Sequence, residues 1–369
     1  MSFRVDNDAY EAWLRLKCHV VEADLEYKHE KMKKDAFTFL RATFFRWART
    51  IEKICPGLSD APAVLSVGDT HVENFGTWRD AEGRLVWGVN DFDEAAVISY
   101  PFDLVRLATS VRLAPGVALS NRDAAKAIAI GYQKGLDEPK PTLLDESAAW
   151  MLPLVACSDE EREKFWNEVR NYPATTPPDE VRSALCSSLP KGAVIKKFAP
   201  RRKGSGGLGR QRFVAVADWR GGSVIREAKA LAPSAWDWAH GGDAQPSSFV
   251  NLATSDYRSP DPFLHIHDGF ILRRIAADSR KIDLGDNAGK LTLQLLEAMG
   301  FDLGAIHAAS GEQKPAIRND LDARPVDWLY EAAKVAAESV RVDYSEWGKL
   351  IPAAIAAVRG FFNLDEKSK

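Results

Sequence analysis

The chain has 369 residues, of which 46% are apolar and 27% charged, and its formal net charge is −3. This length exceeds what one hydrophobic core organises, which excludes a single small domain. The composition is that of an ordinary globular protein, and the nearly neutral charge gives no indication of a nucleic-acid partner.

No uninterrupted run of about 18 apolar residues occurs, and the first residues lack an apolar stretch behind a basic one. We therefore expect a cytoplasmic protein with no membrane segment. The cysteines lack C-x-x-C spacing, which predicts reduced, buried thiols rather than disulfides or a zinc site. They are Cys18, Cys55, Cys157 and Cys186.

The first half of the chain predicts helices around two short strands. Helical periodicity over 8–54 predicts two packed helices. Apolar stretches at 63–67 and 85–89 predict buried strands, with a turn at 80–83. Further helices are expected at 102–114, 121–136 and 158–171, the last with a capping box formed by Ser158 and Glu161.

After the proline-rich stretch 173–178 the pattern changes to strands. It predicts a small, mostly antiparallel sheet with a hairpin turn at 220–222, and a helix within 245–255. The basic residues of 191–212 are interpreted as a solvated flank, because few aromatic residues lie among them. The strands are expected at 193–198, 213–218, 223–229 and 270–275, and helices return at 289–310 and 326–362.

Acidic and amide side chains follow both predicted strands of the first half. Asp69 comes just after the first strand with Asn74 five residues later, and Asp91 and Asp93 follow the second strand. Hard oxygen ligands of this kind suit Mg²⁺, which takes one or two carboxylates together with substrate phosphates. Phosphoryl transfer also needs an aspartate that receives the proton of the acceptor hydroxyl. The alternative is a set of turn-capping residues beside a solvated acidic loop.

The run Gly68-Asp69-x-His71-x-x-Asn74, then an apolar strand and Asp91-Phe-Asp93, resembles the catalytic and metal loops of aminoglycoside-phosphotransferase-like kinases. With Phe37-x-Phe-Leu-Arg upstream and Pro101-Phe-Asp103-Leu downstream, the chain is similar to the bacterial domain-of-unknown-function family 2252, although Ala42 stands where that family usually has glycine. The resemblance implies that Asp69 is the catalytic base, Asn74 and Asp91 are magnesium ligands, and Asp93 is a second acidic ligand. It also implies that His71 and Asp103 brace the catalytic loop.

Residues 203–209, Lys-Gly-Ser-Gly-Gly-Leu-Gly, match G-x-G-x-x-G between two predicted strands. A Rossmann site needs a helix directly after this motif, whereas a strand follows here. Strand, glycine loop and strand is the kinase arrangement, in which the next strand carries a lysine that reaches the phosphates. The alternative is an ordinary flexible hairpin. The predicted nucleotide contacts are Gly204, Ser205, Gly206, Gly207, Gly209 and Lys229.

These motifs predict an α+β, two-lobed, protein-kinase-like fold that is circularly permuted, because the catalytic loop precedes the glycine loop. The expected parts are a helical lobe over 1–185 and 281–369 and a small antiparallel β lobe over 186–280. Kinases usually hold the strand lysine with a glutamate on the next helix, but no glutamate occurs between Ala228 and Leu296. Asp237, Asp243 and Asp256 are the candidate substitutes.

The leading hypothesis is ATP-dependent and Mg²⁺-dependent phosphoryl or nucleotidyl transfer to an unidentified small-molecule or protein acceptor. A non-catalytic nucleotide-binding module is the first alternative. The second is a binuclear metallophosphoesterase that would use Asp69, His71 and the pair His265 and His267, but such enzymes also need a G-N-H motif, which the sequence lacks. No nucleic-acid or membrane partner is expected.

Overall fold

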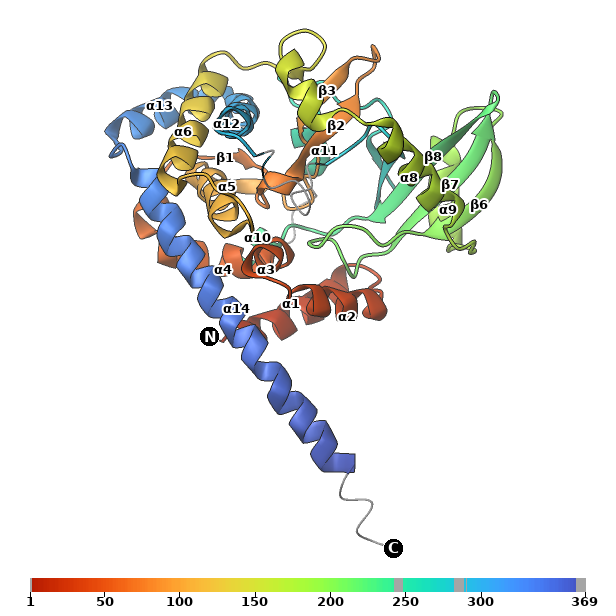
Figure 1. Ribbon diagram of the computed structural model, residues 1–369, viewed down its shortest axis with the longest axis horizontal. Helices are drawn as coiled ribbons and strands as arrows, with labels where there is room; N and C mark the ends of the chain where they lie inside the picture. The colour runs from red at the N-terminus through yellow and green to blue at the C-terminus, as the bar shows by residue number, and fades with distance from the viewer. Residues whose placement is uncertain (1, 242–247, 282–288, 290, 363–369) are drawn as a thin grey trace, which may run out of the picture.

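The computed structural model describes residues 2–241, 248–281, 289 and 291–362 (Figure 1). The chain begins with helices whose first turns are capped by side chains: Ser2 accepts a hydrogen bond from the N–H of Val5, and Asp35 accepts one from Thr38. Four helices take the place of the two expected over 8–54, because the helical backbone is interrupted at 18–21, at 32–35 and at Thr43. They are α1 (Phe3–Lys17), α2 (Glu22–Lys31), α3 (Ala36–Ala42) and α4 (Phe44–Ile54).

Two small antiparallel sheets follow. β1 (Ala63–Ser66) pairs with β4 (Ala96–Ser99), and β2 (Phe75–Arg79) pairs with β3 (Leu85–Val89), which also pairs with β5 (Thr142–Leu143). The turn expected at 80–83 is present, and Asp80 Oδ1 accepts the N–H groups of Glu82 and Arg84 within it. This turn joins β2 to β3, however, so the two strands predicted from the sequence are not hairpin partners.

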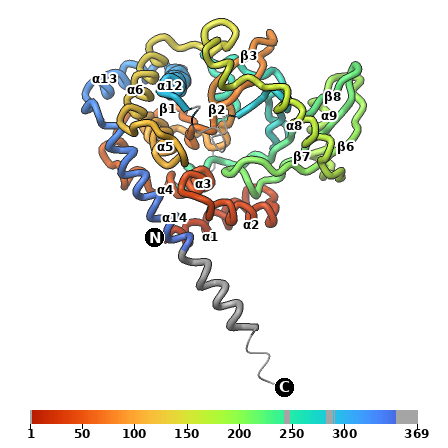
Figure 2. The backbone as a smooth tube through the Cα atoms, in the orientation of Figure 1, coloured from red at the N-terminus to blue at the C-terminus, as the bar shows by residue number. Residues whose placement is uncertain are grey.

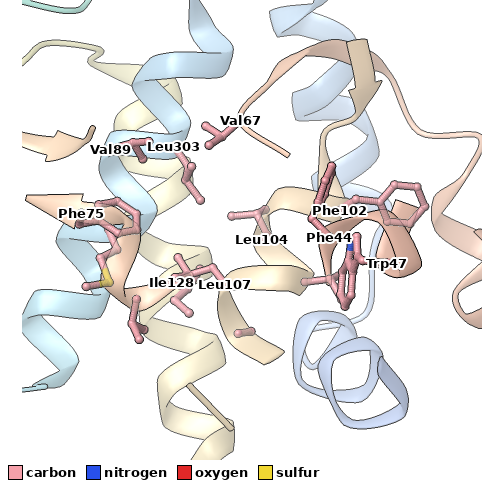
Figure 3. Packing of buried hydrophobic residues seen from close by; sticks show 14 of the residues in the cluster. Phe44, Trp47, Val67, Phe75, Val89, Phe102, Leu104, Leu107, Ile128 and Leu303 are labelled. Atoms are coloured by element: carbon pink, nitrogen blue, oxygen red, sulfur yellow. The ribbon is translucent and has the colours of Figure 1, made fainter. Parts of the chain in front are cut away.

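The largest hydrophobic core lies where α5 (Pro101–Leu113), α6 (Asn121–Asp137) and α12 (Leu293–Ala308) pack together. Figure 3 shows Leu104 and Leu107 of α5, Ile128 of α6 and Leu303 of α12 in this packing. The backbones of α6 and α12 approach so closely that a Cβ on Gly131 would lie 1.8 Å from the carbonyl oxygen of Glu297. Glycine at this crossing is therefore a packing requirement.

A five-stranded antiparallel sheet follows, and α9 packs on one of its faces and α8 on the other. Val181 and Leu185 of α9 pack on Ala228, whereas Val169 of α8 packs on the face of Val214. The capping box predicted at Ser158 and Glu161 begins α8. The elements are α8 (Asp159–Arg170), α9 (Asp179–Ser188), β6 (Val194–Pro200), β7 (Arg212–Trp219), β8 (Gly222–Ala230), β9 (His265–His267) and β10 (Phe270–Ile275), in sheet order β6-β7-β8-β10-β9.

Figure 2 traces the chain from the red helices α1 and α2, through the green sheet, to the blue helices α12 and α14. After β10 the chain returns to the small sheets, where the N–H of Thr77 donates to the carbonyl of Arg280 at 2.7 Å. In the described part of the chain, no helix is long and apolar enough to cross a membrane. The remaining helices are α7 (Leu152–Val155), α10 (Ala235–His240), α11 (Phe249–Ala253), α13 (Lys314–Ala323) and α14 (Trp328–Phe362).

The structure thus has mixed α and β elements with small antiparallel sheets, as the sequence predicts. The helix expected within 245–255 is α11, and the first part of that range, up to residue 247, lies outside the described residues. All four cysteines are free thiols, as predicted, but only Cys55 among them is buried; Cys186 is exposed.

Candidate functional site

The loop after β1 is fixed by Asp103 in the first turn of α5. Asp103 Oδ2 accepts the N–H of Val67 at 2.8 Å, and Oδ1 accepts the N–H of Gly68 at 2.9 Å. His307, at the end of α12, places Nε2 3.2 Å from Asp103 Oδ2. Helices from distant parts of the sequence therefore hold the backbone that presents Asp69.

Asp69 itself is held by a buried arginine. Nε of Arg106 donates to Asp69 Oδ1 at 2.9 Å, and Nη2 of the same guanidinium also contacts this oxygen. Arg106 is fully buried, with its guanidinium 5.0 Å from the ring centre of Phe44 and 5.1 Å from that of Trp47. One carboxylate oxygen of Asp69 is thereby fixed in place. The sequence contained the signal for Arg106, since it follows Asp103 by three residues on one helix and so lies on the same face.

His71 closes the turn after Asp69. Its Nδ1 accepts the N–H of Glu73 at 3.2 Å and begins the single 3₁₀ turn Val72–Asn74. Burial, together with the nearby positive charges of Arg41, Lys281 and Arg106, lowers the pKa of His71 well below its usual value. A neutral, buried imidazole fits the loop-bracing role implied by the resemblance.

Asn74 joins the two acidic loops, which are the loop after β1 that carries Asp69 and the loop after β3 that carries Asp91 and Asp93. Its Nδ2 donates to the carbonyl oxygens of Asp69 at 3.1 Å and Asp91 at 3.0 Å. Its Oδ1 is buried and has no hydrogen-bond partner among the residues that the structure describes. A buried amide oxygen without a partner is costly, so its retention at the meeting point of two acidic loops points to a ligand.

The carboxylates of the second loop meet two lysines. Lys229 of β8 forms an ion pair with Asp93 Oδ2, and its Nζ lies 3.8 Å from Asp91 Oδ1. Lys281 lies on the other side of Asp91, with Nζ 3.1 Å from Oδ2. Burial raises the pKa of Asp91, but the ammonium groups of Lys229 and Lys281 outweigh it and hold this pKa well below the usual range. Burial lowers the pKa of Lys229 to about 8, against the attraction of Asp91.

The partner of Lys229 therefore differs from those considered from the sequence. Asp93 and Asp91 are the carboxylates beside Lys229, whereas Asp237 lies in α10 and Asp256 follows α11. Asp243 lies outside the described residues. Lys281 was not identified from the sequence, because its return to β2 depends on long-range pairing.

The basic residues of 191–212 are only partly a solvated flank, contrary to the expectation. Arg210 is buried, with Nη1 3.3 Å from Asp93 Oδ2 and Nη2 3.1 Å from Glu94 Oε1. Arg201 pairs with the buried Glu227 of β8. Arg210 therefore lies beside the loop that carries Asp93, held by a bridge to Val20, whereas Arg201 lies against β8. Lys196 and Arg202 remain largely exposed.

The glycine loop lies between β6 and β7, as predicted, and is in contact with both groups of side chains. A Cβ on Gly206 would lie 3.2 Å from Asp69 Oδ2, and one on Gly207 would lie 3.0 Å from Lys229 Nζ. Gly204 and Gly209 have positive φ angles of 83° and 96°, which residues with a side chain rarely adopt. Ser205 is buried within the loop. The structure thus brings together the predicted residues from both halves of the chain.

The oxygen atoms at this site fit a divalent cation of the Mg²⁺ type. Oδ1 of Asp93, like Oδ1 of Asn74, is buried without a hydrogen-bond partner in the described parts of the chain. Amide and carboxylate oxygens are the ligands that Mg²⁺ prefers, with phosphates and waters completing the shell. No three His, Cys, Asp or Glu side chains of the described residues form a ready-made metal cluster. A cation here would therefore take Asn74, Asp91 and Asp93 together with ligand oxygens.

The histidines considered for a metallophosphoesterase lie on β9. Nδ1 of His265 is 3.2 Å from the carbonyl oxygen of Phe263, and Nε2 of His267 is 3.2 Å from a carboxylate oxygen of Asp268. His71 is the N-cap of its own turn. Each of these three imidazoles thus contacts a residue one or two positions away in its own loop or strand.

Comparison with known protein families finds a similarity over one region of the chain. A family model described as "Uncharacterized protein conserved in bacteria (DUF2252)" matches residues 20–150, which confirms the resemblance to that family. No curated protein and no solved structure matches the chain significantly. The matched region contains Asp69, Asn74, Asp91 and Asp103 but ends before the glycine loop. Across residues 20–150, the chain is therefore similar to this bacterial family.

Proposed function

We propose that the protein is a magnesium-dependent phosphotransferase that binds ATP and transfers a phosphoryl group to a hydroxyl or amine acceptor. The observation that carries the proposal is the position of the glycine loop, where adjacent glycines contact Asp69 and Lys229. A glycine loop, a lysine, a catalytic aspartate and a metal-binding asparagine and aspartate are the recurring parts of kinase sites. In this chain two segments far apart in the sequence supply them.

Each residue has a definite role in this proposal. Lys229 and the backbone of the glycine loop bind the phosphates, and Asp69 receives the proton of the acceptor group. Asn74 and Asp91 hold Mg²⁺ with Asp93 beside them, and the bound metal neutralises charge on the phosphates. Because Lys229 pairs with Asp93 and the loop contacts Asp69, the loop and the lysine must shift to admit a nucleotide.

The proposal includes a circularly permuted, protein-kinase-like arrangement. The five-stranded sheet with its glycine loop comes after the Asp69 loop, and α12 comes after the sheet. The contact between His307 of α12 and Asp103 supports this arrangement, since it places the end of a late helix against the early catalytic loop. Such a reordering is tolerated where the joined ends lie at a surface.

The decisive experiment combines nucleotide binding with turnover. We expect ATP with Mg²⁺ to raise the melting temperature, since a ligand at hundredfold excess over its Kd stabilises by about 2.7 kcal/mol. Asp91→Asn should weaken the Mg²⁺ dependence of binding, and Asp69→Asn should abolish transfer from labelled ATP to a metabolite pool while binding remains. Asp322→Asn, on the exposed face of α13, is the control. Absence of any thermal shift with millimolar ATP and Mg²⁺ would overturn the proposal.

A non-catalytic nucleotide-binding module is the second candidate, and the ion pair between Arg106 and Asp69 favours it. The Arg106 guanidinium already donates to Asp69 Oδ1, so this oxygen is engaged and less available to an acceptor hydroxyl. This candidate predicts the same thermal shift with ATP, but no labelled product from either the wild-type protein or Asp69→Asn. The turnover assay therefore separates the two functions.

A further inference from the structure

A second cation lies opposite Lys229 in the sheet. Arg212 of β7 is the direct cross-strand partner of Lys229 of β8. Like charges directly opposite each other destabilise a pair of strands. Two basic residues at such a position are therefore a local cost to folding that the sheet itself does not explain.

Arg212 is also poorly satisfied. Its side chain is 9% exposed, and Nη1 lies 3.9 Å from Glu227 Oε2, too far for a hydrogen bond. No described residue accepts a hydrogen bond from the Arg212 side chain. A guanidinium offers five N–H donors, and those of Arg212 are not fully enclosed by the described residues, so they remain available to a ligand.

Glu227, the carboxylate near Arg212, is already engaged by other arginines. Nε of Arg273 donates to Glu227 Oε1 at 2.7 Å, and Arg201 forms an ion pair with Oε2. Three guanidinium groups around one carboxylate leave an excess of two positive charges. Burial lowers the pKa of Arg212; Glu227 opposes this effect, and Arg273 and Arg201 add to it. Asp91 also acts on Arg212, but the group around Glu227 by itself carries more positive than negative charge.

The excess charge faces the glycine loop. A Cβ on Gly207 would lie 3.4 Å from Arg212 Nη2 and 3.0 Å from Lys229 Nζ, so both cations converge on one point of the loop. Guanidinium groups bind phosphate oxygens through paired N–H groups, whereas an ammonium acts as a point charge. The two residues are complementary in how they would bind a chain of phosphates.

We propose that Arg212 and Lys229 together form a two-cation clamp for the phosphate chain of the ligand, beneath Gly207. This inference rests on the proposed nucleotide site and adds a residue and a selectivity to it. Affinity then depends mainly on the number of linked phosphates. Inorganic tripolyphosphate binds at the same place and competes with ATP, whereas AMP and adenosine bind weakly.

The test is calorimetric titration of the full chain with ATP, AMP and inorganic tripolyphosphate in the presence of Mg²⁺. Arg212→Gln should lower the affinity for ATP and for tripolyphosphate by about 10- to 100-fold, the loss expected for hydrogen bonds to a charged group. Arg182→Gln, exposed on α9, makes the same charge change away from the loop and should leave binding unaltered. Because Arg212 lies opposite Lys229 and near Arg273 and Arg201, the melting temperature of unliganded Arg212→Gln should be equal to or above that of the wild type.

The outcomes separate this inference from the proposed function. Equal ATP affinity in wild type and Arg212→Gln would overturn the clamp but leave the nucleotide site standing. Loss of melting temperature in unliganded Arg212→Gln would also overturn it, since that result assigns Arg212 a structural role. Failure of the wild type to bind either ATP or tripolyphosphate would overturn both proposals.

Discussion

Asp93 connects the loop after β3 to the five-stranded sheet. Its Oδ2 accepts contacts from Lys229 and Arg210, while Oδ1 is buried without a partner in the part of the chain that the structure describes. Breaking a buried ion pair by removing one partner costs more than a surface pair, because the other charge is left uncompensated. In the proposed function, ligand phosphates replace Asp93 as the partner of Lys229, and Arg210 keeps Asp93 compensated.

Gly207→Ala tests the contact between the glycine loop and Lys229. A Cβ at this position would lie 2.9 Å from Lys229 Cε, so the buried lysine must move away from Asp93. We expect the free energy of unfolding to fall by about 1–3 kcal/mol, the usual cost of overpacking, and ATP affinity to fall with it. Urea denaturation and calorimetry measure the two effects.

Gly222→Ala is the matched control for this substitution. No atom lies within 4 Å of a Cβ at Gly222, and its φ angle is not in the left-handed region. Alanine there should stabilise the protein by about 0.4–1 kcal/mol, because it restricts the unfolded chain. A Gly207→Ala protein as stable as the wild type would contradict the close approach of loop and lysine.

At the residue scale, motif spacing was sufficient to predict that Asp69, Asn74 and Asp91 lie close together. Asp69 and Asp91 each follow the end of a predicted strand, and Asn74 lies five residues after Asp69, so their proximity depends on short-range sequence spacing. The basic half was harder, because Arg210 and Arg212 lie in a run whose composition resembles a solvated surface. The pairing of β7 with β8 places Arg212, and an isolated bridge to Val20 places Arg210. A sequence pattern carries no information on that register.

Among the elements, α12 supports both acidic loops. His307 contacts Asp103 behind the Asp69 loop, and Asp302 Oδ2 accepts the N–H of Val89 at 2.7 Å at the end of β3. Arg258 completes the second contact by donating to Asp302 Oδ1 at 2.7 Å. The spacing of Asp69 and Asp91 is thus set by one helix that belongs to neither loop.

Asp302→Ala should therefore be among the more damaging substitutions outside the site. It leaves the buried Arg258 without this carboxylate and the N–H of Val89 without its acceptor, so we expect a loss of about 3–5 kcal/mol in unfolding free energy. Asp322→Ala, exposed on α13, should change stability little. Urea denaturation of both variants is the measurement, and equal midpoints would contradict the role of α12.

Glu161 connects α8 to the segment that carries Lys281. It forms an ion pair with Arg280 and caps α8 through the N–H of Ser158 at 2.8 Å. Burial raises the pKa of Glu161, but the hydrogen bond from Ser158 and the charge of Arg280 outweigh it and lower this pKa from 4.5 to about 2. The folded state thus prefers the ionised carboxylate, and this stability is present above pH 4.5.

Glu161→Gln should remove that contribution and little else, since glutamine retains an acceptor for the cap. The pair is partly exposed, so we expect a loss of about 0.2–1 kcal/mol near pH 7. The difference from wild type should vanish as the pH falls from about 4.5 toward 2, where Glu161 becomes protonated in both states. Glu163→Gln on the exposed side of α8 is the control, and a difference independent of pH would contradict the ion pair.

The elements themselves were predictable where periodicity was strong. The strand predicted at 85–89 and the helix at 121–136 match β3 and α6 to within one residue. β2 and β4 were missed because each is only four or five residues long and carries polar residues. α9 was missed because it begins directly after prolines that read as a linker. The order of strands in the sheet depends on contacts between distant segments.

At the scale of the whole molecule, the proposed ligand joins parts that are separate in the chain. ATP with Mg²⁺ should slow amide hydrogen exchange in both 69–74 and 204–209, because phosphates held between these segments restrict their opening. Residues 314–323 of α13 serve as the internal control and should exchange at the same rate with and without ligand. Protection in one of the two segments alone would contradict a shared site.

The late position of α12 also bears on how the protein is made. A nascent chain lengthens by about 5–20 residues per second, so the Asp69 loop leaves the ribosome well before Asp302 and His307 are synthesised. During that interval the loop lacks its helical brace, and Asp93 lacks Lys229 and Arg210. Residues 20–150 thus match the family model, but a translation product that ends there would lack the contacts from His307, Lys229 and Arg210 that position Asp103 and Asp93.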